Sequence, residues 1–116
     1  MQIGYVNVNV SNFDVALDFY TNIVGLTVNA ADPEFGYASF NAGSIAMGIA
    51  QTDDPNLVGK HTGIGFIVKD IDAEYERMLK LGVEFDMPPT KQPWGGVLAL
   101  FKDPDGNIFY LDPGHS

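Results

Sequence analysis

His61 is the only histidine of this chain away from its C-terminal end, and the sequence contains no cysteine. An imidazole can serve as an acid, as a base or as a hydrogen-bond donor to a ligand. The absence of cysteine excludes disulfides, thiolate metal sites and a thiol nucleophile. No serine with a recognisable base partner accompanies His61, so nucleophilic catalysis has no support. His61 is therefore either an ordinary solvated loop histidine or a lone group that contacts a ligand.

The DPDG stretch, residues 103–106, lies between two apolar segments near the C-terminus. A calcium loop would need a spaced series of oxygen ligands that ends in an acidic residue, and none follows. Proline in the second position and glycine in the fourth are typical of a type I turn. We expect the turn to set the register of the next strand, so that Ile108 and Tyr110 face a cavity while Phe109 and Leu111 lie behind.

Trp94 is the single tryptophan of the chain, and it stands between Pro93 and the pair Gly95 and Gly96. This context places the indole at the entrance to a strand, where glycine permits movement. Two roles are open for it: stacking on a ligand, or covering the core as a rim aromatic.

The formal net charge is -9, with only six Lys and Arg residues, which argues against nucleic acid as a partner. A negative electrostatic potential concentrates cations near a cleft, but a net charge also keeps a protein soluble, so the charge alone fits either role. Four acidic residues fall in two loops, where they either form solvated surface or surround a cavity mouth: Asp32, Glu34, Asp53 and Asp54. No apolar run could span a membrane and no leader pattern opens the chain, so we expect a cytoplasmic protein without a membrane partner.

The opening segment, MQIGYVNVNV, alternates valines with polar residues and predicts a half-buried strand. The next, SNFDVALDFYTNIVGL, predicts a helix that is capped by Ser11 or Asn12 and ends at Gly25. The same order returns later, with the strand TGIGFIVKD and the helix DIDAEYERMLKLGV, capped by Asp70 and ended by Gly82.

Aligning Val10 with Val68 also aligns Gly25 with Gly82 after a one-residue gap, which indicates an internal duplication. Three strand-like segments follow each helix. We therefore predict an α+β fold of two βαβββ modules, residues 1–51 and 62–116, joined by a linker over residues 52–61. Neither module is large enough to bury its own sheet well, so together they should make one domain, a curved mixed sheet around a shared cavity.

The segments VNVNVSNFDVALDFYTNIVGL and PWGGVLALFKDPDGNIFYL, in this duplicated order, resemble the vicinal-oxygen-chelate superfamily. That group contains glyoxalase I, the extradiol dioxygenases and the bleomycin-resistance proteins. The resemblance extends over essentially the whole chain. It implies the paired-module fold and a homodimer, which members of the group commonly form.

Metal-dependent members of that superfamily take His or Glu ligands from the first and the last strand of each module. The matching positions here are Tyr5, Ala46 (Gly48 if the register shifts by two), Gly63 and Tyr110. None offers the imidazole, carboxylate or thiolate that a divalent metal needs. The resemblance therefore favours the metal-free members, which bind a small molecule without transforming it, and we predict no metal site, no cofactor and no catalytic residue.

The predicted ligand-binding residues are mostly aromatic, with a few neutral polar groups: Tyr5, Asn7, Phe40, Met47, His61, Trp94, Phe101 and Tyr110. Such a lining suits a planar or amphipathic organic molecule, drug-like and aromatic or cationic. For Phe40, Met47 and Phe101 core packing is the alternative.

Two other functions stay open. One is a metal-dependent lyase, isomerase or dioxygenase of the same superfamily with an atypical ligand set, in which His61 converges with a carboxylate. The other is a protein-interaction module whose concave side is filled by side chains.

Overall fold

The computed structural model describes residues 1–114 and divides the chain into two compact units, Met1–Val58 and Gly59–Ser116. The division falls inside the segment expected to be a linker. A 3-10 turn, Pro55–Leu57, precedes it, and the first strand of the second unit begins at His61. None of the helices in the described part of the chain has the length and apolar character needed to cross a bilayer.

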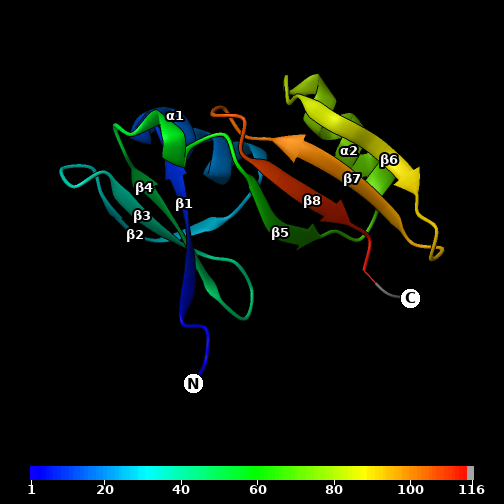
Figure 1. Ribbon diagram of the computed structural model, residues 1–116, viewed down its shortest axis with the longest axis horizontal. Helices are drawn as coiled ribbons and strands as arrows, with labels where there is room; N and C mark the ends of the chain where they lie inside the picture. Colours follow the sequence, from blue (N-terminus) through cyan, green and yellow to red (C-terminus); the bar gives the residue numbers. More distant parts are fainter. Residues whose placement is uncertain (115–116) are drawn as a thin grey trace. The chain divides into compact units, whose positions relative to one another are not determined.

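The first unit contains a single four-stranded sheet (Figure 1). Its elements, in chain order, are β1 (Tyr5–Val10), α1 (Phe13–Asp18), the π-helical turn η1 (Phe19–Ile23), β2 (Thr27–Asp32), β3 (Tyr37–Asn41) and β4 (Ala46–Gln51). The strands lie in the order β1-β4-β3-β2, and β1 runs parallel to β4 while the other neighbours are antiparallel.

The second unit repeats this arrangement. It consists of β5 (His61–Ile67), α2 (Ile71–Lys80), β6 (Phe85–Lys91), β7 (Val97–Lys102) and β8 (Ile108–Asp112). Its strand order is β5-β8-β7-β6, again with one parallel pair at the edge. The chain is thus an α+β protein made of two βαβββ modules, as the duplicated sequence pattern predicts.

The two modules begin their helices with the same device. The side-chain oxygen of Asn12 accepts a hydrogen bond from the Val15 amide (3.1 Å), and the Asp70 carboxylate accepts one from the Ala73 amide (3.1 Å). Each side chain satisfies an amide that the helix leaves unpaired. Asn12, rather than Ser11, is therefore the cap of the first helix.

The first helix differs from the expected regular helix in its second half, which widens into the π-helical turn η1. The Val24 amide donates to the Phe19 carbonyl, five residues earlier (3.0 Å). Within this turn the Thr21 hydroxyl donates to the Leu17 carbonyl (2.7 Å). A side-chain donor on a helix carbonyl competes with the backbone donor that would otherwise occupy it, and it loosens the turn.

One face of each sheet is buried against the helix of its own module. In the first module Val10, Phe40 and Ile49 are fully buried, and the Phe40 ring lies 6.0 Å from that of Tyr20. In the second module the rings of Phe101 and Phe109 stack with their centroids 5.5 Å apart. Burial of Phe109 and Leu111, with the intervening residues less buried, confirms the face alternation expected for the last strand.

Candidate functional site

The face of the first sheet opposite the core carries polar and small residues. On β1, Tyr5 and Asn7 alternate with the more buried valines. The strand register places Tyr5 beside Ala46 and Asn7 beside Gly48 of β4. The structure therefore brings two predicted ligand-binding residues, Tyr5 and Asn7, onto one face of the first module.

A hydrogen-bonded pair stands on this face above Gly48. The Tyr37 hydroxyl, from β3, donates to the side-chain oxygen of Asn7 (3.2 Å). A Cβ atom at position 48 would collide with that Asn7 oxygen and lie 2.5 Å from the Tyr37 hydroxyl, so the pair needs glycine beneath it. Because the Asn7 oxygen accepts from Tyr37, its amide group is left to donate to a ligand. Tyr37 was not predicted, and its only sequence signal is its place in the alternating segment FGYASFN.

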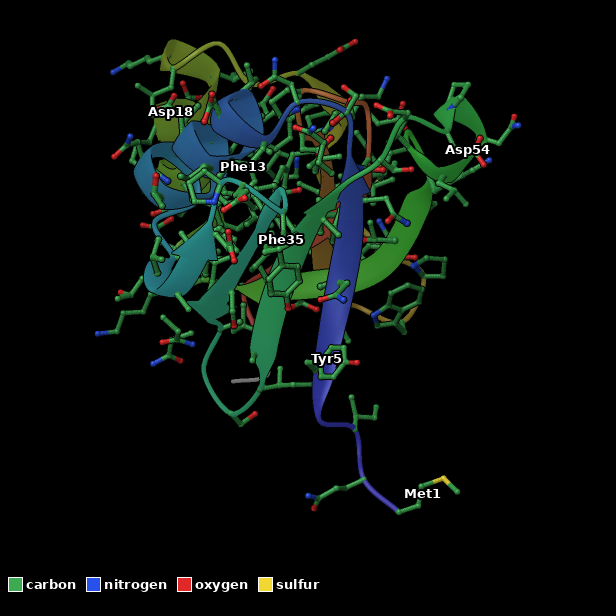
Figure 2. All side chains as sticks on the ribbon, turned by 90° about the vertical axis from the view of Figure 1, so that its left-hand side faces the viewer. Met1, Tyr5, Phe13, Asp18, Phe35 and Asp54 are labelled. Carbon is green, nitrogen blue, oxygen red and sulfur yellow. The ribbon has the colours of Figure 1, made fainter. Side chains whose placement is uncertain are left out.

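Two exposed aromatic rings project from the first module. Tyr5 is 65% exposed, and Phe35, in the turn between β2 and β3, is 78% exposed. Both rings point toward the viewer in Figure 2. Exposed aromatic rings of this kind are available to contact a ligand or a partner. Phe35 is a second residue absent from the predicted set.

The second module brings His61 and Tyr110 together. Their rings lie 5.0 Å apart in an edge-to-face arrangement. The Gly63 amide donates to His61 Nδ1 (3.1 Å), so the neutral ring carries its proton on Nε2, where it can donate to a ligand. His61 is thus an exposed residue at the start of β5 that lies edge-to-face with Tyr110, and its role in ligand binding stays a prediction.

Trp94 lies at the far end of the same module, beside an open cleft of about 480 Å³. Leu98 of β7 and Asp112, the last residue of β8, also line this cleft. Asp112 was not predicted, although it stands two residues after Tyr110 and so shares its side of the strand.

Phe40, Met47 and Phe101 are placed differently from the other members of the predicted set. Their exposed fractions are 0%, 1% and 0%, and they lie on the helix-facing sides of their sheets. In each case strand alternation turns the residue away from the face that carries Tyr5 or Tyr110. They occupy the core, the alternative that the sequence left open.

The strand register settles which residue of β4 corresponds to Tyr110. Tyr110 pairs with Gly65, and Gly48 pairs with Asn7. The alignment of Val10 with Val68 makes Asn7 equivalent to Gly65. Their strand partners are therefore equivalent too, so the counterpart of Tyr110 is Gly48 and not Ala46. The four positions that hold metal ligands elsewhere are here Tyr5, Gly48, Gly63 and Tyr110.

These four residues do not fit a divalent metal. Two are glycines, and the space above Gly48 is already filled by the Asn7–Tyr37 pair. Gly63 has a positive φ of 71° in an irregular part of β5. Among residues 1–114 no three His, Asp or Glu side chains gather in a way that could hold a metal ion.

The DPDG stretch forms the expected turn. The Gly106 amide donates to the Asp103 carbonyl (2.9 Å), and Gly106 has a positive φ of 83°. The buried Asp103 carboxylate accepts from the backbone amides of Asp105 and Asn107 (both 2.9 Å). These oxygens hold the turn and so set the register of β8, which positions Tyr110.

The acidic loop residues are exposed, and two of them stabilise turns. Asp54 accepts from the Asn56 amide (2.9 Å), and Asp32 from the Phe35 amide (3.4 Å). Glu34 and Asp53 are likewise exposed. Two of the four therefore have a local structural role.

A model of the Glyoxalase/Bleomycin resistance protein/Dioxygenase superfamily matches residues 2–111. The protein YetH of Bacillus subtilis is similar to this chain, with 36% identity over 118 residues that cover 95% of this chain and 96% of YetH. The metallothiol transferase FosB of Shouchella clausii is 25% identical over 117 residues, covering 97% of this chain and 80% of FosB.

Among solved structures the chain is similar to TnmS3, an antibiotic binding protein from Streptomyces sp. CB03234. The identity is 29% and the TM-score 0.78, with 97% of this chain and 94% of TnmS3 covered. Sequence and fold thus agree on one superfamily.

Proposed function

Because this chain belongs to the Glyoxalase/Bleomycin resistance protein/Dioxygenase superfamily, we propose that it is a cytoplasmic, metal-independent protein that binds a drug-like aromatic or cationic molecule without transforming it. The observation that carries the proposal is the occupation of the four metal-ligand positions by Tyr5, Gly48, Gly63 and Tyr110. A site without imidazole or carboxylate donors at these positions has lost the groups that metal chemistry requires.

The proposed binding residues are those on the polar faces of the two modules. Tyr5, Asn7 and Tyr37 would serve from the first module, and His61, Tyr110 and Trp94 from the second. Aromatic surface supplies affinity, and the Asn7 amide and the His61 Nε2 proton supply two directional hydrogen bonds. In this proposal each polar face offers its own binding groups, and Phe40, Met47 and Phe101 support the sheets from behind.

The likeness to TnmS3, an antibiotic binding protein, supports this function. The likeness to FosB, a metallothiol transferase, supports enzymatic activity as the alternative; the second candidate is a metal-dependent lyase, isomerase or dioxygenase with an atypical ligand set. That candidate would need His61 to converge with a carboxylate on one ion.

We also propose that the protein is a homodimer. Strand β2 lies at the edge of the first sheet, and all six of its residues are exposed. An uncovered edge strand offers unpaired backbone groups to another chain, and natural proteins usually cover such an edge. Sedimentation equilibrium would test this, and a monomer at all accessible concentrations would contradict it.

The function is tested by elemental analysis of protein purified without added metal or chelator, followed by thermal-shift screening of planar organic compounds. We expect no stoichiometric transition metal before or after soaking in divalent salts, and a saturable rise in Tm with at least one class of planar compound. Near-stoichiometric metal would overturn the proposal and favour the enzyme.

A further inference from the structure

We propose that the cleft beside Trp94 is a cation subsite, in which Asp112 pairs with an ammonium, amidinium or guanidinium group of the ligand while Trp94 covers it. This inference deepens the proposed binding function and rests on it. The preference for a positively charged ligand is then due to the Asp112 carboxylate and the Trp94 ring, both in the second module.

The cleft is built by the tip of the β6–β7 hairpin and the end of β8. Trp94, Val97 and Leu98 line it from the hairpin, and Asp112 and Pro113 from the other side. Its volume of about 480 Å³ is ample for one aromatic ring with a charged substituent. The lining is a mixture of polar and apolar surface, in which the Asp112 carboxylate lies near the Trp94 ring and Leu98; this suits a cation that carries hydrocarbon and disfavours an anion.

The hairpin turn positions the backbone of Trp94, whose side chain is 70% exposed. The Gln92 amide donates to the Gly96 carbonyl (2.7 Å), and the Gly95 amide donates to the Gln92 carbonyl (2.9 Å), which closes the turn. The indole lies against Gly96. A Cβ atom added at position 96 would come within 2.8 Å of Trp94 Nε1. The exposed ring therefore offers a face to a cation that enters the cleft.

The Asp112 carboxylate is oriented but not neutralised. One oxygen, Oδ1, accepts a hydrogen bond from the Gly114 amide (2.8 Å). None of the ion pairs among residues 1–114 involves Asp112; the two on this sheet join Lys102 to Glu84 and Asp86. A part-buried carboxylate that has no cationic partner among residues 1–114 and lies beside an aromatic face attracts a ligand cation more strongly than a fully solvated carboxylate does.

The test compares benzamidinium with benzamide, two molecules of nearly the same shape that differ in charge. Trp94 is the only tryptophan, so its fluorescence reports binding at this cleft directly. We expect benzamidinium to change the emission in a saturable way and benzamide to bind about tenfold more weakly or worse. Equal binding of the two, or a response to neither, would overturn the inference.

Asp112→Asn is the decisive variant, because its side-chain oxygen can keep the Gly114 hydrogen bond while the charge is removed. It should lower the affinity for benzamidinium about five- to tenfold and leave that for benzamide unchanged, while Asp112→Glu restores the preference. Asp72→Asn, which removes one charge from helix α2 of the same module, is the matched control and should change neither affinity. An equal loss for both molecules in Asp112→Asn, with an unchanged circular dichroism spectrum and Tm, would contradict the charge pairing.

The outcomes also separate this inference from the proposed function. If uncharged planar compounds stabilise the protein in the thermal-shift screen but benzamidinium does not affect Trp94, the cation subsite is wrong and the binding function stands. If the purified protein carries a stoichiometric metal, the binding function fails whatever Trp94 reports.

Discussion

At the scale of single residues, Gly48 shows how a missing side chain can define a site. The position corresponds to a metal-ligand position, yet its space is taken by the Tyr37 hydroxyl and the Asn7 oxygen. The two atoms are the ends of flexible side chains, so they can move if something larger occupies position 48. The residue types at Tyr5, Gly63 and Tyr110 could be read from the sequence, but the partner that fills position 48 could not.

We predict that Gly48→Ala lowers the free energy of unfolding by about 1 kcal/mol, because the new methyl group must displace the Asn7–Tyr37 pair. In a Tyr37→Phe background the same change should cost less, since the hydroxyl is already gone. Urea denaturation of the two single variants and the double variant measures this coupling. Strictly additive effects would contradict it, and Gly4→Ala, with no atom within 4 Å of its Cβ, is the control.

At the scale of elements, the turn that joins β7 to β8 also fixes the start of β5. The side-chain oxygen of Asn107 accepts from the amides of Gly59 (2.8 Å) and Lys60 (3.1 Å), and its amide donates to the Asp103 carboxylate (2.9 Å). Asn107 is only 2% exposed, so water cannot replace these bonds. The turn was predicted from the DPDG stretch; its bond to a segment 48 residues away was not.

We predict that Asn107→Ala lowers the free energy of unfolding by about 2 kcal/mol, because two backbone amides in part-buried hydrogen bonds and one buried carboxylate oxygen lose their partner. Asn56→Ala, in the exposed 3-10 turn, should change it by less than about 0.5 kcal/mol. Chemical denaturation of both variants checks this. Equal effects at the two positions would show that the Asn107 bonds do not stabilise the fold.

At the scale of the whole molecule, charge is distributed unevenly along the chain. The formal net charge is -9, and all six Lys and Arg residues lie beyond residue 58, so every charged side chain of the first unit is acidic. The three ion pairs among residues 1–114 all belong to the second unit. The acidic side chains of the first unit therefore repel one another, and that unit contains no Lys or Arg to offset the repulsion.

We predict that raising the ionic strength from about 0.01 M to about 0.15 M increases Tm by a few degrees, because salt screens this repulsion. The same change should weaken benzamidinium binding, since it also screens the attraction of Asp112. Differential scanning calorimetry and Trp94 fluorescence measure the two effects. A Tm that falls with salt would mean that ion pairs outweigh the repulsion.

The sequence by itself determined the α+β class, the two βαβββ modules, the cap of the second helix and the DPDG turn. Each of these is encoded by neighbours a few residues apart, through alternation, a capping side chain or a glycine at a turn. The tertiary structure decided which residues meet. Strand pairing brings Tyr37 to Asn7, 30 residues away, and His61 to Tyr110, and it turns Phe40, Met47 and Phe101 into the core. The difference has a physical cause, because a shift of one residue in register moves every side chain of a strand to the other face, and only the paired sheet fixes that register.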